Sequence, residues 1–198
     1  GMIITPAFVD GFSTTALKDL DERVSISAAT DTQNEHAVLY VPVSHNTDNA
    51  TGIFVTAQEH DQLESLLAQL KPPTQLFIES LSTDNLTEIL AQVEKQPNAA
   101  LLRSRHRILL NHQVTAEQVT KLVELHTSVT VVPDVVDNTP IFHAPVAALI
   151  AQGVQVATGT GSWQGSIWDL LTALIEQPDE HQRISTRAAF NTVSRDGI

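Results

Sequence analysis

The feature that most constrains the fold is the segment from residue 128 to residue 176, in which two short apolar runs flank a stretch with helical periodicity. Residues 128–133 and 154–158 have the length and the β-branched composition of buried strands. Between them, apolar residues recur at helical spacing from Pro145 and stop at Gly153. The segment therefore predicts a β-α-β unit. Its two strands run parallel because the helix carries the chain back to the end of the sheet at which the first strand begins.

A glycine turn follows the second of these strands. Residues 159–162 read Gly-Thr-Gly-Ser, and Ser166 and Asp169 then have the spacing of a helix N-cap and its capping box. The apolar residues between 167 and 175 fall on one face of the predicted helix. Parallel α/β sheets bind their ligands at the carboxyl ends of the strands, so the 159–162 loop is placed where a ligand would sit.

The same alternation of strand and helix begins at residue 52. Strands are predicted at 53–55, 75–79, 99–102 and 108–110, and capping boxes at Thr56 with Glu59 and at Thr115 with Gln118. We expect the strands at 75–79, 99–102, 129–133 and 154–158 to lie parallel and adjacent in one sheet.

The first part of the chain carries strand candidates without intervening helices, at residues 2–11, 23–27 and 37–43. A closed eight-stranded (β/α) barrel typically takes about 250 residues, and this chain has 198. We therefore predict an abbreviated TIM-like (β/α) barrel with parallel strands, and an open doubly wound parallel sheet as the alternative. Residues 2–198 form one predicted domain, and Gly1 before Met2 is interpreted as a cloning remnant.

Composition narrows the class of protein further. No run approaches the roughly 18 apolar residues of a membrane helix, and no secretory signal pattern opens the chain, so we expect a cytoplasmic protein without a membrane partner. The formal net charge of -12 argues against binding to nucleic acid, which needs a basic surface. The chain has no cysteine, so any metal would need histidine and carboxylate ligands.

Two segments resemble the amidohydrolase superfamily. The opening ITPAFVDGFSTT is similar to the first barrel strand of that superfamily, where two histidines in a His-x-His motif hold the catalytic metal. The later HRILLNHQVTAEQVTKLVELHTSVTVVP and APVAALIAQGVQVATGTGSW resemble the last strands of its cytosine deaminase, chlorohydrolase and imidazolonepropionase branch. In that branch the final strand delivers a metal-binding aspartate, and the closing RISTRAAFNTVSRDGI is similar to the helix after the barrel.

The chain departs from the superfamily pattern at the metal ligands. Phe12, Ser13 and Thr14 stand where the resemblance implies His-x-His, and Gly161 stands where it implies the metal-binding aspartate. A hydrolytic metal needs about three protein ligands to hold it and to lower the pKa of its water. The preferred hypothesis is therefore a degenerate relative without metal-dependent hydrolysis or a cofactor, which works as a binding or interaction protein for a small molecule or a partner.

The alternative is a metal-dependent hydrolase or deaminase that acts on C–N bonds with a rearranged site. Its catalytic candidates are His106, Asp134, Asp137 and His143, and zinc, if bound, would lie at His106 or His112. Each of these residues also has an ordinary interpretation as a surface, capping or turn residue. The wider pool of possible ligands is His45, His106, His112, Asp134, Asp137 and His143.

Three further features have weaker functional interpretations. The Gly-Thr-Gly-Ser turn could expose backbone N–H groups to a phosphate, but it lacks the P-loop lysine, and a plain strand-to-helix turn is the simpler interpretation. Residues 103–107, RSRHR, are the only basic cluster and could bind an anion or could be a solvated loop. No G-x-S-x-G elbow supports serine hydrolysis. An abbreviated barrel would expose apolar surface, so we also expect a homodimer.

Overall fold

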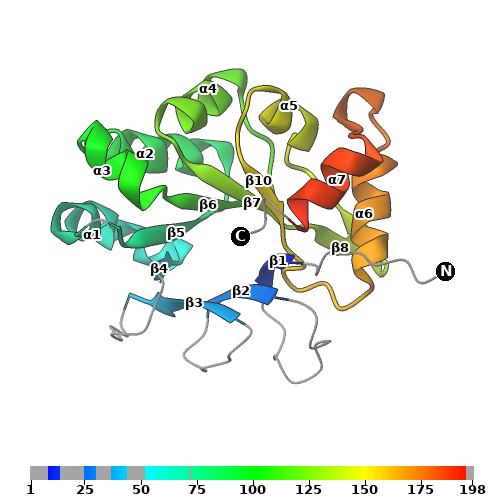
Figure 1. The fold of residues 1–198 in the computed structure, drawn as a ribbon, viewed down its shortest axis with the longest axis horizontal. Coiled ribbons are helices and arrows are strands. Elements are labelled where there is room, and N and C mark those ends of the chain that lie inside the picture. The colour runs from blue at the N-terminus through cyan, green and yellow to red at the C-terminus, as the bar shows by residue number, and fades with distance from the viewer. Residues whose placement is uncertain (1–8, 14–24, 30–36, 44–51, 72, 195–198) are drawn as a thin grey trace.

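The computed structural model describes residues 9–13, 25–29, 37–43, 52–71 and 73–194, and these residues form an α/β protein with a parallel sheet (Figure 1). Eight strands follow one another in the order β1-β2-β3-β4-β5-β6-β7-β10, and every neighbouring pair is parallel. The strands are β1 Val9–Ser13, β2 Ser25–Ala29, β3 Ala37–Pro42, β4 Gly52–Val55, β5 Gln75–Ser80, β6 Arg107–Leu110, β7 Ser128–Val131 and β10 Val156–Thr158.

The described helices all lie after β4 in the chain, and Figure 1 shows them along the outer side of strands β4 to β10. The described residues between β1 and β4 belong to β2, to β3 and to the turn residue Val43, and the predicted lack of helices in the segments that join these strands concerns residues outside the described ranges. The helices are η2 Ala57–Gln62, α1 Leu63–Gln69, α2 Thr83–Val93, α3 Asn98–Ser104, α4 Ala116–Glu124, α5 Val146–Ala151, α6 Ile167–Ile175, η3 Glu180–Gln182 and α7 Thr186–Thr192.

The three predicted capping boxes are confirmed. Ser166 and Asp169 begin α6, Thr115 and Gln118 begin α4, and in each case the cap side chain accepts a backbone N–H while the later side chain accepts the cap's own N–H. Thr56 and Glu59 form the same arrangement, but the first turns that follow are 3₁₀ and become α-helical at Leu63. Helix starts are thus set by local sequence.

One predicted strand is wrong. Residues 99–102 were expected in the sheet, but they belong to the helix α3, and the strand beside β5 is β6 instead. The segment Ala99-Ala100-Leu101-Leu102 contains good helix formers and no β-branched residue. Leu101 is buried and Leu102 is half exposed, so one helical face packs and the other is solvated. The strands at 75–79, 129–133 and 154–158 do lie in one parallel sheet.

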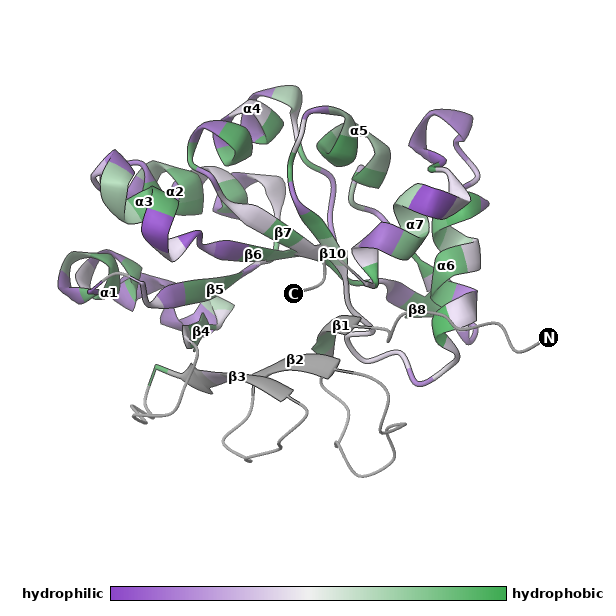
Figure 2. Ribbon diagram, in the orientation of Figure 1, coloured by the Kyte–Doolittle hydropathy of each residue, from purple (hydrophilic) through white to green (hydrophobic). Residues whose placement is uncertain are grey.

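The two faces of the sheet carry different cores. Leu76 and Ile78 on β5 face the larger core between sheet and helices, and Figure 2 shows the hydrophobic sides of the helices turned toward the strands. The other face holds a compact group, here called the aromatic cluster, in which Phe77 packs against three rings at centroid distances of 5.2 to 5.4 Å. The aromatic cluster consists of Phe12, Tyr40, Phe54, Phe77 and Leu109.

A hairpin that was not predicted interrupts the β-α-β unit after β7. Its strands β8 Asp134–Val136 and β9 Thr139–Ile141 pair antiparallel as a separate two-stranded sheet. Asp137 and Asn138 both have positive φ, which is the backbone of a two-residue type I′ turn. Val135 and Val136 are exposed, so the hairpin strands lack the alternating buried pattern by which strands are recognised.

The first and last strands of the sheet order contact each other. The N–H of Gly161, just after β10, donates to the carbonyl of Phe12 in β1 at 2.8 Å. A Cβ added at Gly159 would lie only 2.5 Å from the Phe12 nitrogen and 2.6 Å from its carbonyl oxygen. Only glycine therefore permits this approach of the two backbones.

Candidate functional site

The carboxyl ends of the central strands carry a connected polar group. Glu79 at the end of β5 accepts the N–H of Ala57 through Oε2 at 2.9 Å, which ties the start of η2 to the neighbouring strand. The Glu79 carbonyl lies 2.8 Å from His60 Nε2, and His60 Nδ1 lies 2.9 Å from the amide nitrogen of Asn85. Because a carbonyl can only accept, the neutral His60 ring carries its proton on Nε2. None of these three residues was predicted as a site residue.

His112 also lies at the carboxyl ends of the strands, two residues beyond the end of β6. Its Nδ1 is 2.8 Å from the Gln113 carbonyl, so Nδ1 carries the proton and Nε2 accepts from the Ser80 hydroxyl at 2.9 Å. A serine paired with an oriented histidine is the arrangement that activates a nucleophile. Here, however, the Ser80 side chain is 2% exposed and pairs in register with Leu110, which belongs to the core under the helices. Ser80 is thus buried whereas His112 is only partly buried, and the pair joins the ends of β5 and β6.

His106 lies at the opposite side, where the strands have their amino ends. It immediately precedes β6, so it is at the amino end of a strand, and it is 4% exposed. Its Nδ1 accepts the N–H of Leu76 at 3.0 Å, which leaves the proton of the neutral ring on Nε2. The expectation that His106 stands near a strand-end ligand position is therefore not met by its place in the fold, because ligands bind at the carboxyl ends.

Burial lowers the pKa of His106 from 6.5 to about 4, because a charged ring would lose its solvation. The unfolded chain then binds more protons than the folded chain between these two values. Stability is full above pH 6.5 and falls toward pH 4. We expect His106 to account for a loss of about 3 kcal/mol in the free energy of unfolding across this window.

Urea unfolding at several pH values tests this expectation. A His106→Asn variant keeps an acceptor for the Leu76 N–H and removes the titrating ring. Its unfolding free energy should depend on pH less steeply than that of the wild type between pH 6.5 and 4. Equal slopes for the two proteins would show that His106 is not the group responsible.

The fold brings two of the candidate residues, Asp134 and His143, into contact, and a rearranged metal site would need at least such a pair. His143 Nε2 lies 3.0 Å from Asp134 Oδ2, and both side chains are nearly half exposed. An exposed pair of this kind contributes little to stability. Asp137, in contrast, occupies the hairpin turn with φ of 48°, a conformation that Asp tolerates well, so turn chemistry explains its presence. His45 lies outside the described residues.

Across the described parts of the chain, no three His, Cys, Asp or Glu side chains gather closely enough to hold a metal ion. Phe12, where the resemblance implies a metal ligand, is buried and stacks on Phe54 at 5.3 Å. Gly161, where the resemblance implies another, has φ of 58° and contacts Phe12 through its backbone. The two positions therefore lie next to each other, but neither of them carries a side chain that could bind a metal ion.

The Gly-Thr-Gly-Ser turn does not abut a helix. Helix α6 begins at Ile167, and its N-cap Ser166 accepts the N–H of Trp168 at 3.1 Å. Three residues, 163–165, separate this cap from the end of the 159–162 turn. The phosphate-binding interpretation needs glycines directly at a helix N-terminus, so the turn serves the close approach of β1 and β10 instead.

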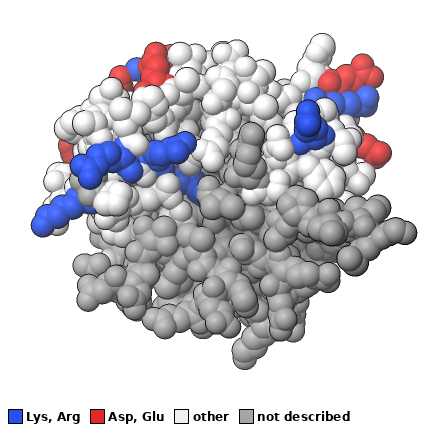
Figure 3. Space-filling view, viewed as in Figure 1, with Lys and Arg blue, Asp and Glu red and all other residues white. Residues whose placement is uncertain are grey.

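The RSRHR cluster divides between surface and interior. Arg103 and Arg105 are exposed, and Figure 3 shows Lys and Arg side chains gathered on the face of the molecule over the region of α3. Arg105 has positive φ, ends α3 and donates through Nη2 to Gln155 Oε1 at 2.9 Å. Arg107 is buried, with its guanidinium carbon 5.6 Å from the centre of the Phe77 ring. One part of the cluster is therefore a structural cation–π contact.

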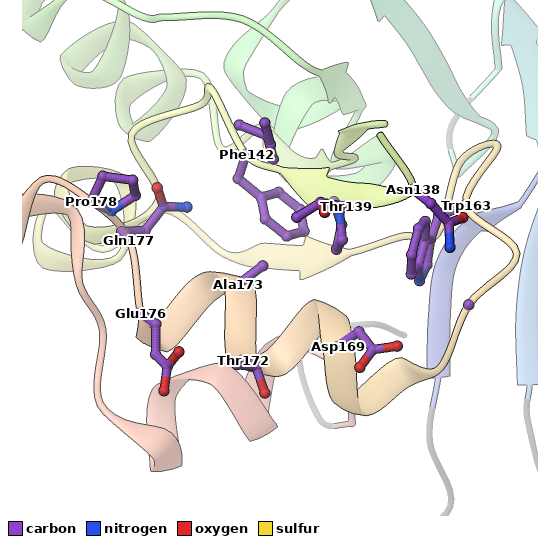
Figure 4. A pocket seen from close by; sticks show the side chains of 13 residues that line it. Asn138, Thr139, Phe142, Trp163, Asp169, Thr172, Ala173, Glu176, Gln177 and Pro178 are labelled. Carbon is purple, nitrogen blue, oxygen red and sulfur yellow. The ribbon is translucent and has the colours of Figure 1, made fainter. Parts of the chain in front are cut away.

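A pocket of about 670 Å³ lies between α6 and the β8–β9 hairpin, on the outer side of the sheet. Figure 4 shows α6 along one side and the hairpin strand β9 along the other, with Trp163 at one end and Gln177 and Pro178 at the other. We call it the α6 pocket. Its lining residues are Asn138, Thr139, Pro140, Ile141, Phe142, Trp163, Gly165, Asp169, Thr172, Ala173, Glu176, Gln177 and Pro178.

The chain matches no protein-family model, no curated protein and no solved structure. Fold and site together define an α/β protein with a parallel sheet, a polar group at the strand ends and a pocket beside α6. None of the described helices has the length and apolar character needed to cross a membrane.

Proposed function

We propose that this chain is an amidohydrolase-like protein whose eight strands close into an abbreviated (β/α) barrel, and that it binds a small molecule without metal-dependent hydrolysis. The observation that carries the proposal is the contact between Phe12 and Gly161. In the superfamily that the sequence resembles, the first and last strands must approach each other because both supply ligands to the same metal. The corresponding positions of this chain lie within one hydrogen bond of each other.

The residues at those positions argue against metal chemistry there. Neither a phenylalanine ring nor the side chain of a glycine offers a lone pair to a divalent cation. The Phe12 ring instead packs face to face on Phe54 and edge-on against Phe77, at 5.3 and 5.4 Å. Aromatic pairs in these geometries stabilise the packed state beyond the burial of their surface. The interior at this end of β1 is thus filled by side chains.

The second candidate is a metal-dependent hydrolase or deaminase with a rearranged site, favoured by the contact of Asp134 with His143 at 3.0 Å. Two side chains are fewer than the three that a catalytic zinc takes. The pair also lies on and beside the hairpin, with both side chains nearly half exposed to solvent. The first candidate is therefore preferred.

Metal content separates the two candidates. Protein purified without chelator should carry well under one equivalent of zinc, iron or manganese per chain, measured by elemental analysis. Cyclic amides and amidines should be hydrolysed no faster in the presence of the protein than in buffer alone. A full equivalent of transition metal that is lost in a His143→Ala variant would overturn the proposal and support the rearranged site. A His126→Ala variant, which removes an exposed histidine elsewhere, is the matched control.

A further inference from the structure

We infer that the α6 pocket binds an organic cation with a flat apolar body, such as an aryl-substituted amine. This inference rests on the proposed binding function and specifies the ligand class. Two properties of the pocket lead to it: an apolar wall large enough for a ring system, and carboxylates that no basic residue of the lining balances.

The apolar wall is preformed. Phe142 and Trp163 are each 5% exposed, so their positions are fixed by packing before any ligand arrives. Ala173 on α6 lies opposite Phe142 in Figure 4, and its small side chain leaves space between helix and hairpin. A volume of about 670 Å³ falls within the range of small-molecule sites. A planar apolar group of one or two rings suits such a slot.

The charges of the pocket are all negative. Asp169 and Glu176 line it from α6, and the lining contains no Lys, Arg or His. The two residues are seven positions apart, so they lie on the same face of the helix about 10 Å apart along its axis. A ligand cation between hairpin and helix would meet a carboxylate at either end. The guanidinium of Arg183, which donates to the carbonyl of the lining residue Gln177 at 2.8 Å, is already paired with Glu180 at 3.4 Å.

Glu176 is the stronger partner of the two carboxylates. Asp169 already accepts the N–H of Ser166 at 3.3 Å as part of the capping box. Among the described residues, Glu176 pairs with no Lys, Arg or His side chain, and it stands at the C-cap of α6. The carboxyl end of a helix carries partial negative charge, which adds to the attraction for a cation there.

Two probes of similar shape and opposite charge test the inference. Phenethylamine and 3-phenylpropionate would be titrated into the protein, with binding followed by the fluorescence of the two tryptophans, Trp163 in the pocket and Trp168 on α6. We expect saturable binding of phenethylamine and at least about tenfold weaker binding of 3-phenylpropionate. A loss of one exposed ion pair corresponds to about 1 kcal/mol, so Glu176→Gln should weaken phenethylamine about fivefold.

Two controls locate the site. Glu88→Gln makes the same change of charge on the exposed surface of α2, outside the pocket, and should leave the affinity unchanged. Thr172→Phe narrows the pocket at an exposed position of α6, where the larger side chain does not disturb the core, and should abolish binding.

The outcomes distinguish the ligand class from the binding function itself. Tighter binding of 3-phenylpropionate, sensitive to Thr172→Phe, would overturn the cationic assignment and leave the pocket as a binding site. Binding that neither Glu176→Gln nor Thr172→Phe changes, or the absence of saturable binding, would overturn the inference. Neither result bears on the metal content, which tests the proposed function separately.

Discussion

Replacing Phe77 by alanine should lower the free energy of unfolding by about 3 to 5 kcal/mol, the cost of removing a buried aromatic side chain from a packed core. Phe77 is fully buried and is the member of the aromatic cluster that contacts the other three rings, Phe12, Tyr40 and Phe54. It also lies beneath the buried guanidinium of Arg107. The substitution would leave a cavity in the core. It would also remove the cation–π partner of Arg107, whose charge is buried. Urea unfolding followed by tryptophan fluorescence measures the loss.

Two comparisons make this expectation specific. Phe77→Leu keeps most of the apolar volume and should cost less than Phe77→Ala. Leu102→Ala removes an apolar side chain that is half exposed on α3 and should change stability by no more than about 0.5 kcal/mol. If Phe77→Ala proved as mild as Leu102→Ala, the aromatic cluster would not be the packed interior described here.

Replacing Gly159 by alanine should destabilise the protein by about 3 kcal/mol, at the upper end of overpacking effects. The added Cβ would lie 2.5 Å from the Phe12 nitrogen and 2.6 Å from its oxygen, and both are backbone atoms that cannot rotate away. The strand β1 would have to move, which breaks the hydrogen bond from Gly161 to Phe12. Hydrogen exchange should then show faster exchange of the Gly161 N–H than in the wild type.

Gly153→Ala is the matched control for this substitution. Gly153 ends the helix α5 with φ of 87°, and nothing lies within 4 Å of an added Cβ. Its replacement therefore costs only the backbone strain of an L-residue at positive φ, about 1 to 2 kcal/mol. Unchanged protection of Gly161 in Gly159→Ala would mean that β1 and β10 are not held together as described.

Glu176, the carboxylate tested in the α6 pocket, stands at the C-cap of α6 and takes no part in the contact between β1 and β10. Phe12 and Gly161 lie where β1 meets β10, whereas the pocket lies outside the sheet between α6 and the hairpin. A variant such as Glu176→Gln therefore leaves the aromatic cluster untouched. Substitutions at sites without shared partners usually add to within about 0.5 kcal/mol, so the effects of Glu176→Gln and of the Phe77 variants can be measured separately.

The sequence alone determined the features that depend on near neighbours. The capping boxes at Thr115 and Ser166 were predictable because the side chain and the N–H groups that it satisfies lie within three residues. The parallel strands β5, β7 and β10 were predictable because buried strands are short, β-branched and bounded by helix signals. The hairpin β8–β9 was not, because its strands are three residues long and largely exposed.

Only the tertiary structure decided which side chains meet. In the sequence, His106 looked like a residue at the carboxyl end of a strand. In the structure it is buried at the amino end of β6, and the four residues of that strand separate it from the carboxyl end. Glu79 and His60 carried no motif, yet the pairing of β4 with β5 brings them together. The contact of Phe12 with Gly161 joins residues from the two ends of the sheet order. Local spacing determines where helices and strands form, whereas such contacts depend on strand register and on the path of the whole chain.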